Sequence, residues 1–308
     1  MIDQGILQGK YRHCQDTILK DLKSFQSFLY RHFKDHPKYQ DMRPITNQTG
    51  RFFATSKTHK FRSLDDINIT DLKLRPIIDQ TGTCYYNAGK VIAEYLKPIA
   101  QNQFVISDTQ KFPQLLKEVI LEEDEEDVSY DVESLFTSIP VKDTVEFILD
   151  QIYKKNKLKP MCKENIFKKL LFKLTTECIF TVNDTLFKQT DGVSMGGPLS
   201  VVLSGCFMTK MEMDLVVPSS PKFYKRYVDD IYVRRKKGIS DQLFESINKY
   251  HPNLKLTIET NPSKFLDTDI IREENGTLFF KVHDNENKIP FHWSSAVPKR
   301  YKRNIILG

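Results

Sequence analysis

The chain has 308 residues, of which 40% are hydrophobic and 28% charged, and its formal net charge is +6. These values indicate a soluble globular protein of one or two domains, and the mild positive excess suits a polyanionic partner without requiring one. Five scattered cysteines without a C-x-x-C pair argue against a zinc site or a disulfide framework, and the lack of a signal-peptide pattern or a long apolar run argues against a membrane protein.

The first part of the chain is predicted to form helices joined by irregular segments. Apolar residues recur at helical spacing over residues 14–34, and further helices are predicted over residues 86–99 and 111–121. Residues 37–83 carry proline and glycine at intervals that favour loops with short strands. The acidic run from Glu122 to Asp127 is interpreted as a solvated turn ahead of a strand.

The remainder is predicted to contain hairpins and helices. Strands are expected over residues 128–132, 254–259, 265–271 and 277–282. Hairpins are expected around the turns Asn183-Asp184 and Asp229-Asp230. Helices are expected over residues 140–152, 163–178, 199–215 and 240–250. Because helices and strands do not alternate regularly, this order favours an α+β fold over a doubly wound sheet.

Two adjacent carboxylates, Asp229 and Asp230, stand at the predicted turn of the hairpin KFYKRYVDDIYVRRK. They repel each other unless a cation lies between them, and magnesium takes hard oxygen ligands of this kind. Aspartate is also common in ordinary turns, so the pair alone leaves an exposed turn equally open. The hairpin therefore becomes informative only together with a further acidic residue.

Such a residue is Asp131, which follows a predicted strand within SYDVESLF. Two-metal phosphoryl transfer needs carboxylates from separate elements to converge, and a strand end is a rigid mount for one of them. A lone aspartate after a strand is more often a helix cap or turn residue. Between the two acidic motifs lies QTDGVSMGGPLS, whose glycines allow the backbone to approach a ligand before a helix begins.

The ordered series YDVESLF, QTDGVSMGGPLS and YVDD resembles the palm of reverse transcriptases. Longer segments resemble Penelope-like retroelements: SKTHK, RPIIDQTGTCYYNAGKVIAEYLKPI, HPNLKLTIETNPSKFLDT and HWSSAVPKRYKRN. The resemblance implies an α+β right-hand polymerase fold with a four-stranded antiparallel palm sheet. It implies an N-terminal extension and fingers over 1–125, a palm over 126–285 with a fingers insertion at about 141–178, and the start of a thumb over 286–308, the thumb being truncated or absent.

The resemblance also implies roles for single residues. Asp131, Asp229 and Asp230 match metal-binding aspartates, and Val132 would lend a backbone carbonyl to the two Mg²⁺ ions, for which Mn²⁺ could substitute. The residues matched to dNTP binding are Lys57 (or Lys60 in its place), Arg75, Phe136 as the steric gate, and Gln189. Those matched to template and primer are Gly196, Pro198, Tyr227, Phe265 and Leu266. Lys255 and Lys264 both stay open as a proton donor to pyrophosphate.

The function implied is that of a nuclear retroelement enzyme, an RNA-directed DNA polymerase that extends a DNA primer on an RNA template with dNTPs. An RNA-dependent RNA polymerase is an alternative, against which Phe136 argues because its ring would clash with a ribose 2′-hydroxyl. A second alternative is an inactive element fragment that only binds nucleic acid. The basic runs Arg234–Lys237 and Lys299–Arg303 could hold a nucleic-acid backbone. The first could instead be a charged hairpin edge, and either could instead be a nuclear localisation patch.

Overall fold

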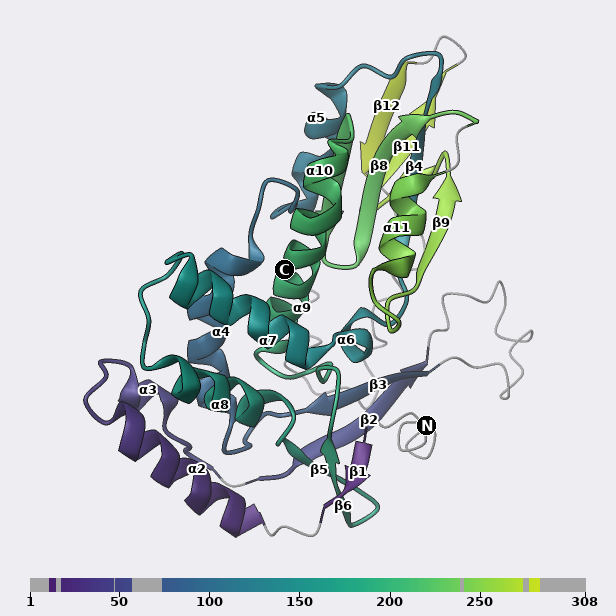
Figure 1. Ribbon diagram of the computed structural model, residues 1–308. Coiled ribbons are helices and arrows are strands. Elements are labelled where there is room, and N and C mark those ends of the chain that lie inside the picture. Colours follow the sequence, from purple (N-terminus) through teal and green to yellow (C-terminus); the bar gives the residue numbers. More distant parts are fainter. Residues whose placement is uncertain are drawn as a thin grey trace.

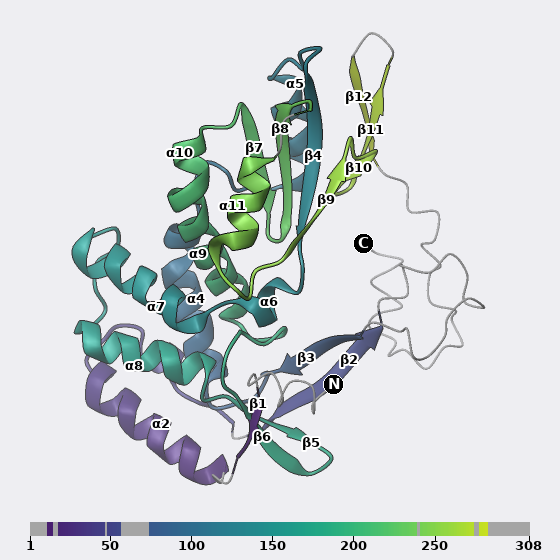
Figure 2. The same cartoon turned by 45° about the vertical axis from the view of Figure 1, so that its right-hand side comes forward.

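The computed structural model describes residues 11–14, 18–46, 48–56, 74–238, 241–273 and 277–282. The predicted site residue Lys57, its alternative Lys60 and the basic run Lys299–Arg303 lie outside these residues. Figures 1 and 2 show two sheets one above the other, with helices packed alongside both. No helix in the described ranges is long and apolar enough to cross a bilayer.

The lower sheet has five strands in the order β1-β6-β5-β2-β3 (Figure 1). Its strands are β1 (Tyr11–His13), β2 (Gly50–Ser56), β3 (Leu74–Asp79), β5 (Ile179–Val182) and β6 (Thr185–Gln189). Neighbours are antiparallel except β2 and β5, which are parallel. The turn between β5 and β6 places Asn183 and Asp184 at φ 45° and 61°, as a two-residue hairpin turn requires, and this confirms the predicted hairpin.

Helices pack beside and above this sheet. They are α2 (Ile18–Phe33), α3 (Tyr39–Met42), α4 (Tyr86–Ala100), α7 (Val141–Leu149), its π-helical continuation η4 (Asp150–Lys154) and α8 (Glu164–Thr175). In α2 the residues Phe25, Leu29 and Phe33 repeat every fourth position and are fully buried. The apolar spacing therefore predicted both this helix and its buried face.

The upper sheet is antiparallel, with four strands in the order β7-β8-β4-β9. Its strands are β4 (Glu125–Val132), β7 (Phe223–Tyr227), β8 (Asp230–Lys236) and β9 (Leu256–Thr260). The upper half of the molecule consists of this sheet and the helices η3 (Thr109–Lys111), α5 (Phe112–Lys117), α6 (Leu135–Ser138), α9 (Ser200–Met211), its continuations η5 (Glu212–Val216) and α10 (Val217–Ser219), and α11 (Gln242–Tyr250); the five-stranded sheet and its helices form the lower half. A small sheet joins β10 (Lys264–Phe265), β11 (Thr268–Arg272) and β12 (Leu278–Val282).

Strand alternation gives the two faces of the upper sheet different partners. Tyr130 and Ile231 point into the main core, which also holds Phe207 of α9 and Ile247 of α11. Tyr232, the next residue of β8, points the other way and packs with α5 and β10, in a second core formed by residues Ile106, Phe112, Leu116, Phe223, Tyr232, Phe265 and Ile270. Every second residue of β4 and β8 thus belongs to the face that carries the second core.

The acidic run was wrongly interpreted as a solvated turn. Its second half is the first part of β4, and Asp127 is fully buried in a salt bridge, with Arg234 Nε 2.8 Å from Asp127 Oδ1. Glu126 pairs with Arg235, and Lys222 lies 2.8 Å from Glu125. Opposite charges that meet across neighbouring strands allow these acidic side chains to enter the sheet.

The same pairing bears on the basic run Arg234–Lys237. Arg235 bridges Glu126 and Asp241, and Lys236 lies 3.2 Å from Asp124 on the surface, so acidic side chains offset part of the charge of the run, and nucleic-acid binding by it stays a prediction. The run is not a sheet edge, because β8 lies between β7 and β4. The run therefore contributes to the structure of the sheet.

Other predicted boundaries need smaller corrections. The strand expected over 265–271 is two strands, since Leu266 takes a positive φ of 54° in the turn between β10 and β11. The helix expected over 111–121 is the shorter α5, and Pro98 lies within α4 instead of ending it.

Candidate catalytic cleft

The three singled-out aspartates meet at the lower end of the upper sheet. Asp131 of β4 lies directly opposite Asp230 of β8 in the antiparallel register, and Val132 N donates a hydrogen bond to Asp229 O over 3.2 Å. Directly opposite residues have Cβ atoms about 4.5–5.5 Å apart and share one face of the sheet. Elements almost a hundred positions apart in the sequence therefore bring their carboxylates together.

The electrostatics of this ladder are unbalanced. Burial, and after it the nearby negative charges of Asp229 and Asp131, together raise the pKa of Asp230 to about 6. At the other end of the same pair of strands, Asp127 faces a cation, Arg234, and not another acid. Like charges placed opposite one another destabilise a sheet. A cation bound between Asp131 and Asp230 would therefore remove a repulsion that the Asp127–Arg234 end of the ladder does not have.

The turn that carries Asp229 is held from behind by a buried ion pair. Arg226 of β7 and Glu212 of η5 are 2% and 0% exposed, and Arg226 Nη2 donates to Glu212 Oε2 over 3.1 Å. Arg226 Nη1 also donates to the carbonyl of Val228 over 3.2 Å, and Val228 has a positive φ of 54°, unusual for a β-branched residue. A rigid buried cation thus fixes the strained residue just before the aspartates.

A cleft of about 390 Å³ opens in front of the aspartates. Its wall is built from β3, the end of β4, the segment leading into α6, the glycine-rich loop, the β7–β8 turn and β9. The residues are Leu74, Arg75, Pro76, Asp131, Val132, Glu133, Ser134, Leu135, Thr137, Met195, Asp229, Asp230 and Thr257. Figure 2 shows β3 below the turn that joins β7 and β8, so the cleft lies between the two halves of the molecule.

Arg75 and Val132 are the other predicted site residues in the cleft wall. Arg75 is exposed on β3, across the cleft from the aspartates, and brings the cation expected near a triphosphate. Phe136 lies on α6 between the wall residues Leu135 and Thr137, but its half-buried ring packs against the main core. The cleft therefore brings acidic and basic groups to opposite walls.

Gln189 is not brought into the cleft. It ends β6, is 2% exposed and donates from Nε2 to the carbonyl of Asp191 over 3.1 Å, while its Oε1 has no hydrogen-bond partner among the described residues. Tyr227, half-buried at the end of β7, packs on the second core. Phe265 is itself a member of that core, and Leu266 forms the turn after it.

The glycine-rich loop adjoins the cleft through its backbone. Met195 O accepts a hydrogen bond from Ile78 N of β3 over 2.9 Å, which ties the loop to the lower sheet. Gly196 is exposed with φ 108°, and a Cβ there would lie 2.8 Å from the carbonyl of Ile78, so glycine is required. Pro198 packs so closely on α4 that a Cβ at Gly89 would lie 2.7 Å from its Cγ.

The two candidate lysines differ in position. Glu133 N, in the cleft wall, donates to the carbonyl of Lys255 over 2.8 Å, and Lys255 precedes the cleft strand β9. Lys264 begins β10, in the three-stranded sheet. Both are exposed, and the backbone places Lys255 beside the cleft. Sequence reasoning did not single out Met195 or Thr257, and only their position after folding reveals them.

The donor set suits a hard divalent cation that is completed by a ligand. In the described ranges no group of three or more His, Cys, Asp and Glu side chains is already arranged around one point. Magnesium normally binds through one or two carboxylates, waters and substrate phosphates, so such a closed protein cage is not needed. The pKa of Asp230 is raised by burial and also by the charges of Asp229 and Asp131, and a cation would offset those charges.

Comparison with known proteins gives a fold and no sequence family. No family model and no curated protein matches the chain. The telomerase from Candida albicans in complex with the TWJ fragment of telomeric RNA aligns with a TM-score of 0.52 and 10% identity, over 86% of this chain and 53% of that chain. Apo telomerase from Candida tropicalis aligns with a TM-score of 0.51 and 12% identity, over 89% and 55%.

This chain spans about half the length of those telomerase chains, at 53% and 55%. At such low identity the likeness concerns the fold alone, which is an α+β polymerase fold of the reverse-transcriptase kind. The prediction of an α+β polymerase fold is therefore confirmed.

Proposed function

We propose that the chain is the catalytic core of an RNA-directed DNA polymerase of a Penelope-like retroelement. The observation that carries the proposal is the direct pairing of Asp131 with Asp230 in the wall of a cleft that also holds Asp229. Two-metal phosphoryl transfer to a primer needs carboxylates that converge from separate elements, as these do. The reverse-transcriptase-like fold also supports the proposal. In this proposal the upper sheet is the palm and the lower half belongs to the fingers.

The reaction is attack of a primer 3′-hydroxyl oxygen on the α-phosphorus of a dNTP, with pyrophosphate leaving. Asp131, Asp229 and Asp230 would hold two Mg²⁺ ions, with the Val132 carbonyl as a further oxygen ligand. When bound, the ions lower the pKa of the primer hydroxyl and neutralise charge on the triphosphate. Arg75, on the facing wall, binds phosphate oxygens through charge-assisted hydrogen bonds.

The remaining roles are proposed from the family resemblance. Gly196 and Pro198 form a backbone platform at the start of α9 against which a base pair can pack. The turn after Phe265 would contact the primer strand. Lys255 is the better candidate for donating a proton to pyrophosphate, because it adjoins the cleft wall through its carbonyl.

Extension of a DNA primer on an RNA template with dNTPs in magnesium tests the proposal. We expect Asp229→Asn to lower the extension rate by on the order of 10²–10³-fold or more, because removing one preorganised charge at the reacting group has at least that effect. Asp184→Asn is the matched control, since Asp184 also lies in a turn that joins two strands but is away from the cleft. It should extend like the wild type.

Two other functions would give different results. An RNA-dependent RNA polymerase would extend with rNTPs in preference to dNTPs. A fragment that only binds nucleic acid would bind primer–template equally well as wild type and as Asp229→Asn, and neither protein would extend it. Either result would replace the proposed function.

A further inference from the structure

A second hollow, separate from the cleft, lies along helix α2. This α2 groove has a volume of about 740 Å³, against about 390 Å³ for the cleft, and the two share no lining residue. Its wall includes Tyr30 and Arg31 of α2, Lys34 just after the end of that helix, and Tyr39 and Arg43 from the segment around α3. In Figures 1 and 2, α8 lies between α2 and α7, so the groove is on the outer side of the lower half.

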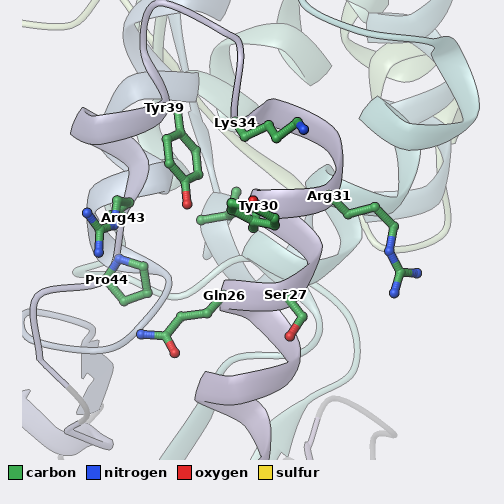
Figure 3. Close-up of a pocket in the computed structure, with 9 residues that line it drawn as sticks. Gln26, Ser27, Tyr30, Arg31, Lys34, Tyr39, Arg43 and Pro44 are labelled. Carbon is green, nitrogen blue, oxygen red and sulfur yellow. The ribbon is translucent and has the colours of Figure 1, made fainter.

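The groove presents two aromatic rings flanked by cations. In Figure 3 the hydroxyl end of Tyr39 points toward Tyr30, with Arg43 on one side of the pair and Lys34 and Arg31 on the other. Tyr30 is 61% exposed although it follows directly after the fully buried Leu29. Because the apolar stripe of α2 is already buried by other residues, the exposed ring is not needed for the core.

The positive charge of the groove is not neutralised within the described part of the chain. Arg31, Lys34 and Arg43 form no salt bridge with a described carboxylate, and none of the lining residues is acidic. Arg43 Nη1 donates to the neutral Gln40 Oε1 over 3.1 Å, and Lys34 Nζ lies 5.8 Å from the centre of the Tyr30 ring. The nearby Lys38, by contrast, does pair with a carboxylate, at 3.2 Å from Asp41.

We propose that the α2 groove binds single-stranded nucleic acid, with phosphates on its cations and unpaired bases stacked on Tyr30 and Tyr39. Aromatic rings interleaved with basic side chains are how proteins hold single strands without reading their sequence. Bases of a duplex are already stacked on one another, so exposed rings of this kind favour an unpaired segment. The inference rests on the proposed function only in the choice of nucleic acid as the anionic partner.

Fluorescence anisotropy of a labelled 12-nucleotide single-stranded RNA with the whole chain tests the groove. Tyr30→Ala should weaken binding about tenfold, as the loss of one stacked base does. Tyr30→Phe keeps the ring and should bind like the wild type, which separates stacking from a folding defect.

The charges are tested by a double variant, Arg31→Gln with Lys34→Gln. Losing two phosphate contacts should reduce the steepness of the plot of log affinity against log salt by about 1.4, since each contact to a single strand contributes about 0.7. The matched control is Lys154→Gln with Lys249→Gln, which removes the same charge from side chains that are 76% and 78% exposed elsewhere. The control should keep the wild-type slope.

Three outcomes would overturn the groove assignment. One is wild-type RNA affinity in Tyr30→Ala, another is a salt slope of the groove double variant equal to that of its control, and the third is equally tight binding of poly-glutamate, which would indicate an acidic protein partner. Binding is measured without dNTPs, so a chain that binds RNA through the groove but never extends a primer would contradict the proposed function and leave this inference standing.

Discussion

The carboxylate of Asp230 differs from an ordinary aspartate because it lies in a partly buried sheet position opposite another acid. Its raised pKa has a consequence for stability without metal. Between about pH 4 and pH 6 the folded protein binds more protons at this group than the unfolded chain does. The free energy of unfolding contributed by Asp230 therefore falls as the pH rises through that window.

We expect Asp230→Asn to remove this loss. In EDTA the wild type and the variant should have similar stability near pH 4, and the variant should become the more stable of the two by pH 7. Magnesium should then stabilise the wild type and have little effect on the variant. Urea unfolding at both pH values, with and without the cation, measures this, and parallel stability profiles would show that the acidic cluster is not strained.

Phe136 is the residue whose predicted role as a sugar gate depends most on the family resemblance. Replacing it with alanine should raise incorporation of rNTPs relative to dNTPs about tenfold, because removing a ring changes discrimination by a few kcal/mol at most. Phe172→Ala is the matched control, since Phe172 is also half-buried against the main core but lies on α8. Unchanged sugar selectivity in Phe136→Ala, measured by single-nucleotide extension, would remove the gate assignment.

Among the secondary-structure elements, those with a strong local pattern were predictable and those that depend on distant partners were not. The helical stripe of α2 and the Asn183-Asp184 turn are written in neighbouring residues. Asp127 looked like a solvated turn residue because its partner, Arg234, is 107 positions away in the sequence. A charge run can be interpreted correctly only when the opposing strand is known.

The Asp127–Arg234 pair between β4 and β8 gives a prediction about these elements. Arg234→Met should lower the free energy of unfolding by about 3–5 kcal/mol, because it removes the nearer cation from a fully buried carboxylate and leaves only Arg272, at 3.6 Å. Adding Asp127→Asn should restore part of the loss, since the uncompensated charge is then gone.

The control for this pair is an exposed ion pair on a helix. Lys249→Met breaks the contact with Glu245, in which the two side chains are 78% and 56% exposed, and should change stability by less than about 1 kcal/mol. Urea unfolding compares the variants. A loss for Arg234→Met as small as that of Lys249→Met would mean that the buried pair is worth no more than a surface pair.

For the molecule as a whole, the close packing of α4 on α9 joins the two halves. A Cβ added at Gly205 of α9 would lie 2.8 Å from Ala100 Cβ at the end of α4. Gly205→Ala should therefore destabilise the protein by about 1–3 kcal/mol through overpacking, despite the better helix propensity of alanine. Thermal unfolding measures the effect, and combining it with Ala100→Gly should recover much of it by returning the space.

The arrangement of the halves was also the part of the site that local reasoning could not supply. Asp131, Asp229 and Asp230 were found from their motifs, but the facing wall of the cleft comes from β3, more than fifty positions upstream of Asp131. Gln189 looked equally eligible in the sequence, yet β6 buries it in the lower sheet. Which motif residues face the cleft is decided by how the two sheets are placed.

The strand order of the lower sheet also bears on how the chain reaches this structure. Tyr11 pairs with Gln189, and β2 finds its parallel neighbour β5 only after the intervening helices have been made. During synthesis the backbone edge of β2 that later pairs with β5 therefore stays unpaired while about a hundred further residues leave the ribosome. Pairings this remote in sequence slow folding, so the unpaired edge of the β2–β3 hairpin is a place where a nascent chain would be exposed to aggregation and would benefit from a chaperone.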